Sequence, residues 1–280
     1  MRPRLALHLS LLALLLGCAS TPPAIDAAFC SRFDAVKHAA DQGRPVVLGE
    51  IHGTQEFPRL TGDLAQCFAA DGTLPVLLLL ELNPGQEPGI ARFLASAGKQ
   101  DDVCALLSHW EWGLSDGRSS IAMFELLDRV RQARQRGSRI EVRTIMDRDD
   151  RGYADRVRMA MKDVGRARAL VLVGNEHANR GESFLGPSKP PTAALLADLD
   201  PLSLVLFYLG GTHWGKGMDS VAGVHSLGGD DAPARSPERF KYPSMRLIPW
   251  GEGRFRFDGA IQLGRVSASL PARTLCEGSR

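Results

Sequence analysis

Residues 75–83 read PVLLLLELN, in which five consecutive apolar residues follow a proline and end at Glu81. A continuous apolar run of this length predicts a β-strand that is covered on both faces, as strands of a parallel sheet are. The same kind of run recurs in residues 45–50 (PVVLGE), 139–146 (RIEVRTIM), 169–173 (ALVLV) and 203–209 (SLVLFYL). We therefore expect five strands at the centre of the fold.

Helix-like stretches separate these runs. The expected helices span residues 31–42, 55–70, 86–107 with a break at Gly98, 118–136, 150–165 and 191–198. This alternation predicts an α/β fold, a mostly parallel central sheet flanked by helices on both faces. The segment from 210 to 280 is rich in Gly, Pro and Arg, and predicts loops and an antiparallel C-terminal edge. Within residues 254–263 we expect a hairpin that turns at Asp258-Gly259.

The composition is that of an ordinary globular protein. Of the 280 residues, 44% are hydrophobic and 24% charged, which excludes a mainly disordered or collagen-like chain. The 34 basic and 32 acidic residues nearly balance, and Arg2 and Arg4 lie in a segment that we expect to be removed. A global electrostatic basis for nucleic-acid binding is therefore missing, and we expect no nucleic-acid partner.

The N-terminus has the pattern of a secretory signal. Two arginines precede an apolar run that is too short to span a bilayer, and the run ends in Leu15-Leu16-Gly17-Cys18. This ending resembles the bacterial lipobox, so we predict a lipoprotein signal peptide over residues 1–17 and lipidation of Cys18. An ordinary cleavable signal ending near Ala19 is the alternative. A tether over residues 18–28 and a single domain over 29–280 would follow, anchored at the bacterial cell envelope, in the outer membrane facing the periplasm.

Four cysteines remain when Cys18 is set aside. Two disulfides among them are expected in an oxidising compartment, with three possible pairings of Cys30, Cys67, Cys104 and Cys276.

Polar side chains follow every predicted strand. They are Glu50 and His52, Glu81, Asp147, Asn175 and His177, and His213. Because ligands of an open parallel sheet bind beyond the carboxyl ends of its strands, these residues predict one site. Two imidazoles and one or two carboxylates are the ligand types of zinc or manganese, so we predict a divalent metal held by His52, His177 and Glu50.

Two motifs at equivalent strand ends carry a family resemblance. The GEIH of residues 49–52 and the GNEHA of residues 174–178, with LLLLELN between them, resemble the ChaN/TIKI superfamily and look most like its ChaN branch. Residues 53–57 (GTQEF) are also similar to distant erythromycin esterase relatives, which place two residues between Glu and His where this chain has only Ile51. The resemblance implies an α/β fold.

The resemblance implies two functions. TIKI-like members are metal-dependent proteases, which would make this chain a metal-dependent hydrolase of a peptide or ester-like bond. Glu50 or Glu81 would then be the base, and Asn175 would orient a ligand or hold the oxyanion. Arg118 is a further candidate, as a clamp for an anionic substrate, although a surface ion pair with Asp116 is the commoner use of such an arginine.

The alternative is a haem-binding lipoprotein involved in iron uptake, as ChaN-like members are. Haem would be held by an axial His or Tyr, with contacts from His109, Trp110 and Trp112, although such a cluster packs at a helix end more often than it contacts a cofactor. The expected partner is thus a small-molecule or peptide substrate, or haem, together with the membrane through the lipid anchor. A scaffold without activity is a third interpretation.

Overall fold

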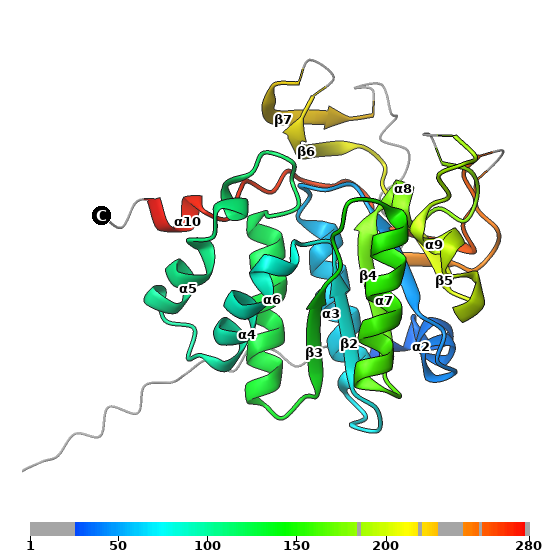
Figure 1. The fold of residues 1–280 in the computed structure, drawn as a ribbon, viewed down its shortest axis with the longest axis horizontal. Coiled ribbons are helices and arrows are strands. Elements are labelled where there is room, and N and C mark those ends of the chain that lie inside the picture. The colour runs from blue at the N-terminus through cyan, green and yellow to red at the C-terminus, as the bar shows by residue number, and fades with distance from the viewer. Residues whose placement is uncertain (1–25, 184–185, 218–219, 229–242, 252–253, 278–280) are drawn as a thin grey trace, which may run out of the picture.

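The computed structural model describes residues 26–183, 186–217, 220–228, 243–251 and 254–277. The predicted signal peptide and Cys18 lie outside these residues. A seven-stranded sheet forms the centre, in the order β3-β2-β4-β1-β5-β9-β8 (Figure 1). Its strands are β1 (Val46–Glu50), β2 (Val76–Leu80), β3 (Ile140–Thr144), β4 (Arg168–Gly174), β5 (Leu202–Phe207), β8 (Ser244–Arg246) and β9 (Gly259–Gln262).

Neighbouring strands of this sheet run parallel except at one edge. The pairs β3–β2, β2–β4, β4–β1, β1–β5 and β5–β9 are parallel, and β8 pairs antiparallel with β9. The predicted α/β fold, mostly parallel with an antiparallel edge near the C-terminus, is confirmed.

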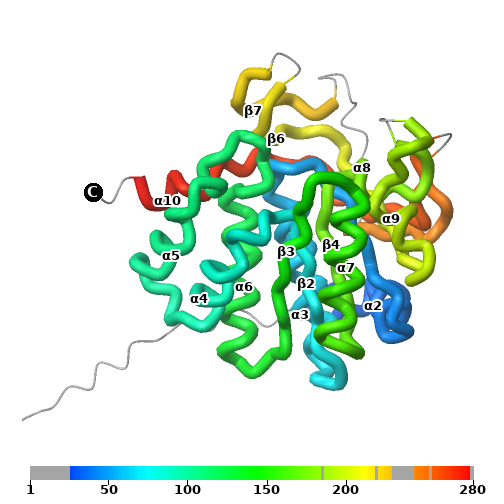
Figure 2. Tube along the Cα trace, in the orientation of Figure 1, coloured from blue at the N-terminus to red at the C-terminus, as the bar shows by residue number. Residues whose placement is uncertain are grey.

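Helices cover both faces of the sheet. They are α1 (Ala27–Ser31), α2 (Asp34–Asp41), α3 (Glu56–Ala69), α4 (Glu87–Ala95), α5 (Gln100–Leu107), α6 (Ile121–Gln135), α7 (Asp150–Val164), α8 (Asn175–Ala178), α9 (Thr192–Leu195) and α10 (Thr274–Glu277), with 3-10 turns at Pro84–Gln86, Trp110–Gly113 and Ala197–Leu199. Figure 2 shows α7 in front of the sheet and α3 behind it. Among the helices of the described residues, none is long and apolar enough to cross a bilayer.

Alternate residues of each strand belong to two separate cores. In β2, Leu78 and Leu80 pack with α3 and α6, whereas Leu77 and Leu79 pack with α7. All four leucines are fully buried. This explains the unbroken apolar runs, because neither face of these strands is in contact with water.

The C-terminal region differs from the expectation in two respects. The predicted hairpin at Asp258-Gly259 is wrong: the Asp258 carboxylate accepts hydrogen bonds from the backbone N–H of Ser203 and from Arg180, and Gly259 begins β9, which runs parallel to β5. These long-range partners outweigh the local turn preference of an Asp-Gly pair. A separate antiparallel hairpin of β6 (Gly211–Lys216) and β7 (Ala222–Leu227) lies beyond the carboxyl edge of the sheet, at the top of Figure 1.

Two disulfides join distant parts of the chain. Cys30–Cys67 links α1 to α3, and Cys104–Cys276 links α5 to α10. This selects one of the three pairings that the sequence left open.

Candidate functional site

The carboxyl edge of the sheet brings four of the predicted residues together. Strands β1 and β4 run parallel in register, with Glu50 opposite Gly174, so the motifs that follow them leave the sheet at the same point. Strand β2 lies on the other side of β4 and ends immediately before Glu81. As a result His52 and His177 both face Glu81, at 3.5 and 3.6 Å from their Nε2 atoms to its oxygens.

Glu81 lies at the centre of this cluster. Its side chain is 2% exposed, and Oε1 accepts hydrogen bonds from Arg118 Nε at 2.8 Å and from the Tyr153 hydroxyl at 3.2 Å. Oε2 accepts from the backbone N–H of Gly174 at 2.7 Å. Burial opposes ionisation, but the positive charges of the two histidines and of Arg118 hold the pKa of Glu81 well below its usual range. Glu81 is therefore a fixed carboxylate rather than a base.

His52 is held between two carboxylates. Its Nδ1 lies 2.8 Å from Glu50 Oε1, and its Nε2 faces Glu81. Burial disfavours the imidazolium, but Glu81 and Glu50 outweigh burial and raise the pKa of His52 to about 10. Burial raises the pKa of Glu50, and its Oε2 is buried without a hydrogen-bond partner. The Glu50–His52 pair therefore holds a proton at neutral pH.

His177 forms a second pair of the same kind. Its Nδ1 lies 2.8 Å from Asp150 Oδ1, which also accepts from the backbone N–H and hydroxyl of Thr192 at 2.7 and 2.6 Å. Despite partial burial, these hydrogen bonds lower the pKa of Asp150, which therefore stays ionised. The ring of Tyr153 stacks on His177 with 4.7 Å between centroids, and this contact fixes the plane of the imidazole.

Arg118 belongs to the site and not merely to the surface. Its guanidinium bonds both Glu81 and Asp116, the latter at 3.0 Å, so the predicted ion pair with Asp116 is present together with a contact that the sequence did not suggest. Burial lowers the pKa of Arg118, but these two carboxylates outweigh burial and raise it. Its charge is therefore permanent.

The remaining candidates lie around the cluster. Asp147 is exposed and pairs with Arg156, so it is not part of the group around Glu81. Asn175 begins α8, and its Oδ1 is buried without a hydrogen-bond partner. His213, in β6, lies across from His225 with 5.7 Å between ring centroids, and burial and His225 lower its pKa.

Asp150 and Tyr153 are site residues that the sequence analysis missed. They lie at the first and fourth positions of α7 and therefore share one face of that helix. The signal that could have found them is the rule already applied to the strands, because α7 begins just beyond the carboxyl end of β3.

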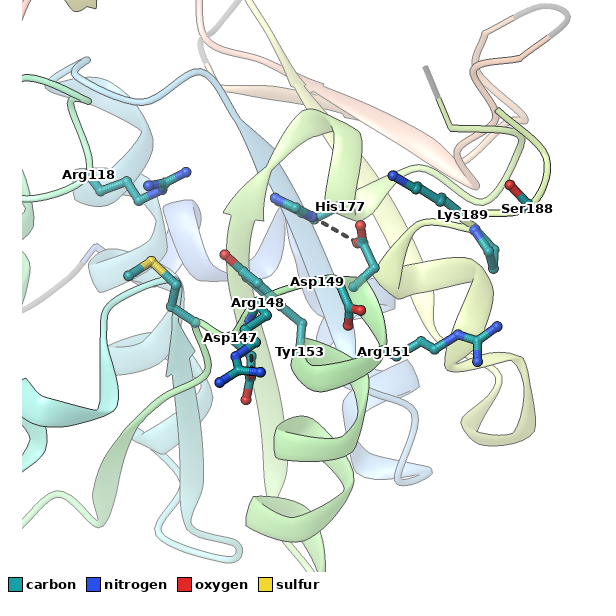
Figure 3. Close-up of a pocket in the computed structure, with 12 residues that line it drawn as sticks. Arg118, Asp147, Arg148, Asp149, Arg151, Tyr153, His177, Ser188 and Lys189 are labelled. Carbon is teal, nitrogen blue, oxygen red and sulfur yellow. Dashed lines mark hydrogen bonds and ion pairs between the residues drawn. The ribbon is translucent and has the colours of Figure 1, made fainter. Parts of the chain in front are cut away.

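Two pockets meet at this cluster. The larger, of about 780 Å³, is lined by Arg118, Tyr153, His177 and the segments 146–151 and 188–190 (Figure 3). The smaller, of about 330 Å³, is lined by Glu50, His52, Asp116, Asn175, His213 and their neighbours, and also by His177. Since His177 lines both, a substrate that spans the two pockets would cross the cluster.

The loop that follows His52 is closely packed against the β6–β7 hairpin. Gly53 has a φ of +76°, and a Cβ there would lie 1.8 Å from the carbonyl oxygen of Trp214 in β6. At Gly117, with a φ of +83°, a Cβ would lie 2.7 Å from that same oxygen. The backbone N–H of Trp214 donates to the Gly53 carbonyl at 2.8 Å. Only glycine fits at these two positions, and the hairpin is thereby fixed against the loop that carries His52.

The predicted metal ligands have other partners. Both Nδ1 atoms are hydrogen-bonded to carboxylates, both Nε2 atoms face Glu81, and the oxygens of Glu81 accept three hydrogen bonds, one of them from a guanidinium. In the part of the chain that the structure describes, no group of three or more His, Cys, Asp or Glu side chains is arranged to hold a metal ion. As placed, these residues do not fit a divalent cation, and zinc or manganese stays a prediction.

The aromatic segment suggested for haem contact is divided between core and surface. Trp112 is fully buried, whereas Trp110 is 60% exposed and stacks on His109. Trp112 therefore packs in the core and is not accessible to a ligand. Haem binding itself stays a prediction.

Comparison with known proteins gives the fold alone. No protein-family model and no curated protein matches the chain. A solved structure of a Bacillus cereus protein is similar with a TM-score of 0.58 and 11% identity, over 86% of this chain and 93% of that one. The structure of a succinoglycan biosynthesis protein is similar with a TM-score of 0.58 and 11% identity, over 85% of this chain and 92% of that one. The structure of the type III effector HopBA1 has a TM-score of 0.47 and 14% identity, over 83% of this chain and 93% of that one. At 11% identity, the two structures with a TM-score of 0.58 show that this chain shares their α/β architecture. The ChaN/TIKI resemblance remains a prediction.

Proposed function

We propose that the protein is a hydrolase of ester-like or peptide bonds that uses its two histidines as base and acid. The observation that carries this proposal is the pair of histidine–carboxylate contacts, His177 with Asp150 and His52 with Glu50, whose Nε2 atoms face the same carboxylate where two pockets meet. A carboxylate on Nδ1 orients an imidazole for proton transfer at Nε2. Two such imidazoles at one point can serve both halves of a hydrolysis.

His177 is suited to the base. It takes a proton from water at Nε2, and the resulting hydroxide attacks the carbonyl carbon of the substrate. Because Asp150 stays ionised, it stabilises the imidazolium that forms. Arg118, permanently charged and lining the larger pocket, is placed to stabilise the negative charge that develops on the carbonyl oxygen.

His52 is suited to the acid. It carries a proton at neutral pH and lines the smaller pocket, so it can protonate the leaving oxygen or nitrogen as the bond to the carbonyl carbon breaks. The products are a carboxylic acid and an alcohol or amine, and proton exchange with water restores both histidines. A divalent metal is not part of these steps.

The first experiment measures hydrolysis of chromogenic aryl esters and of a peptide library by the full chain. His177→Gln and His52→Gln should each lower kcat/KM about 100-fold or more, the usual contribution of a positioned acid or base. His38→Gln, in α2, is the matched control and should match the unsubstituted protein. If no ester or peptide is cleaved, or if the three variants behave alike, the proposal is wrong.

Metal dependence is tested in the same assay. Activity that survives chelation, with no bound metal by mass spectrometry, supports proton transfer by the histidines alone. Activity that needs added Zn²⁺ or Mn²⁺ would replace this mechanism with the metal-dependent one predicted from the sequence.

The pH profile of kcat/KM tests the two roles. The base must be neutral, and the pKa of His177 is raised above 6.5 because its bond to Asp150 outweighs burial, so the acid limb should lie above pH 6.5. The acid must be protonated, so activity should fall on an alkaline limb near pH 10. A rate that is independent of pH between 6 and 10 would contradict both assignments.

The location of this activity is also a proposal. The lipobox-like ending at Cys18 suggests a lipid-anchored protein of the bacterial envelope, and two disulfides are the usual mark of an oxidising compartment. Membrane fractionation of the full chain beside Cys18→Ser tests this: the substituted protein should leave the membrane fraction.

A further inference from the structure

The larger pocket has an unusual balance of charge. Its lining includes three acidic residues, Asp147, Asp149 and Asp150, and four basic ones, Arg118, Arg148, Arg151 and Lys189. Figure 3 shows that the Lys189 side chain extends toward the side on which His177 lies. The three negative and four positive charges nearly cancel. The charge that a ligand meets in the pocket therefore depends on which of these groups are already paired within the protein.

The three acidic groups are all engaged by the protein. Asp147 accepts from Arg156 Nε and from the backbone N–H of Arg148, both at 2.7 Å. Asp149 is the N-cap of α7 and accepts from the backbone N–H of Gly152 at 3.0 Å. Asp150 is bonded to His177 and Thr192, as described above. Asp147 and Asp150 are thus paired with Arg156 and His177, whereas Asp149 is bonded to the backbone of its own helix.

Three of the basic groups have no such partner. Within the described residues, the side chains of Arg148, Arg151 and Lys189 make no ion pair or hydrogen bond, and all three residues are exposed at the pocket. By contrast Arg156 and Arg158, on the same helix as Arg151, are paired with aspartates. The pocket therefore presents a net positive surface to whatever enters it.

We propose that the substrate carries an anionic group, a carboxylate or a phosphate, which binds in the larger pocket among Arg148, Arg151 and Lys189. This inference rests on the proposed function and deepens it, because it assigns the two pockets to the two halves of the substrate. The anionic acyl portion occupies the larger pocket, the carbonyl lies at His177 and Arg118, and the leaving group enters the smaller pocket beside His52. Guanidinium and ammonium groups bind both kinds of anion.

A binding experiment tests this without requiring catalysis. Inorganic phosphate and succinate are titrated calorimetrically into the full chain at constant ionic strength, beside the triple variant Arg148→Gln/Arg151→Gln/Lys189→Gln. The matched control is Arg134→Gln/Lys162→Gln/Arg166→Gln, which removes the same charge at exposed positions away from the pocket. We expect the first variant to bind at least tenfold more weakly than the control, and the stronger of the two probes identifies the kind of anion.

A substrate comparison then connects binding to catalysis. The p-nitrophenyl hemiester of succinic acid is compared with p-nitrophenyl butyrate, which is similar in length but uncharged. The unsubstituted protein should prefer the charged ester at least tenfold in kcat/KM, mainly through KM. The triple variant should lose that preference, whereas the control variant Arg134→Gln/Lys162→Gln/Arg166→Gln should keep it and should cleave both esters as the unsubstituted protein does.

The outcomes separate the two proposals. Equal anion binding by both variants, or no binding by the unsubstituted protein, overturns the assignment of the pocket. Equal use of the charged and uncharged esters overturns it as well, while the proposed hydrolysis stands. If neither ester is cleaved but phosphate or succinate binds only when the three cations are present, the hydrolase proposal fails and the anion site is retained.

Discussion

A cluster of buried charge lies at each end of strand β4, and the two clusters are built differently. At its start, Arg168 is 3% exposed and donates to Asp41, Asp71, Thr73 and the carbonyl of Phe68, with 2.5 Å to Asp41 and 2.7 Å to Asp71. At its end, the carboxylate of Glu81 accepts hydrogen bonds from Arg118, Tyr153 and Gly174. The Nε2 atoms of His52 and His177 lie farther from its oxygens, at 3.5 and 3.6 Å.

The two clusters differ in whether their buried polar atoms all have hydrogen-bond partners. The described groups around Arg168 are matched donor to acceptor, and none of the pockets above opens there. Around Glu81, by contrast, Glu50 Oε2 and Asn175 Oδ1 are buried without partners, and two pockets open. Unpartnered buried polar atoms are costly and are retained where a ligand or reaction uses them. We therefore interpret the first cluster as structural and the second as functional.

The largest expected effect separates activity from stability at the second cluster. His177→Gln should reduce kcat/KM by about 100- to 10,000-fold, or roughly 3–5 kcal/mol of transition-state free energy. Its effect on the free energy of unfolding should stay below about 1 kcal/mol, because Asp150 keeps its bonds to Thr192. Hydrolysis rates and urea denaturation measure the two quantities. A large loss of stability would assign His177 to the structural kind of cluster.

The converse is expected for Arg168. Arg168→Gln leaves Asp41 and Asp71 without their main cation, and should lower the free energy of unfolding by about 2–3 kcal/mol, less than for a fully buried pair because each aspartate is about one-third exposed. Activity per folded molecule should not change. Denaturation and active-site-normalised rates check this, and loss of activity in the folded variant would break the distinction.

The two clusters should also respond to opposite changes of pH. The bond to Arg168 lowers the pKa of Asp71, so its stabilisation is present above about pH 3.8 and is lost as the pH falls below that value. The pKa of His52 is raised from 6.5 to about 10, so its stabilisation is complete below pH 6.5 and is lost as the pH rises through 10.

Denaturation from pH 2 to 10.5 measures both effects. Arg168→Gln should flatten the acid side of the stability curve and leave the alkaline side unchanged. His52→Gln should flatten the alkaline side, and it should also weaken the acid side because His52 helps to lower the pKa of Glu81. A change of the alkaline side in Arg168→Gln would show that the two clusters are not independent.

The smallest effect is expected at the margin of the structural cluster. Lys37 contacts Asp71 at 2.7 Å and Asp41 at 3.5 Å but is 25% exposed, so Lys37→Met should cost only about 0.2–1 kcal/mol of stability. The loss should shrink in 1 M salt. A cost as large as that of Arg168→Gln would show that the cluster depends on all its charges and not on the buried one.

The sequence predicted the central sheet well because its strands are buried on both faces. The run of residues 75–81 needed only its apolar length to be recognised, and the structure has β2 at Val76–Leu80. The convergence of Glu50, His52, Glu81 and His177 followed from the same fact, since parallel strands end at one edge.

The features that the sequence did not predict depend on contacts between residues far apart in the chain. Asp150 and Tyr153 reach the site through the position of α7, and the Asp258-Gly259 turn is replaced because Asp258 is bonded to Ser203, 55 residues away. Disulfide pairing and the partner of Arg118 depend likewise on how the helices pack, which a local pattern does not specify.

The contact of Gly53 and Gly117 with the Trp214 carbonyl has a consequence for how substrate preference can change. Since the backbone at this contact admits no side chain, the position of the β6–β7 hairpin is fixed, and substitutions there would disturb the loop that carries His52. Lys216 of the same hairpin is exposed and lines the smaller pocket, and its side chain is free of that constraint. Directed evolution of this protein should therefore accumulate specificity-altering substitutions at Lys216, while both glycines stay unchanged in every active clone.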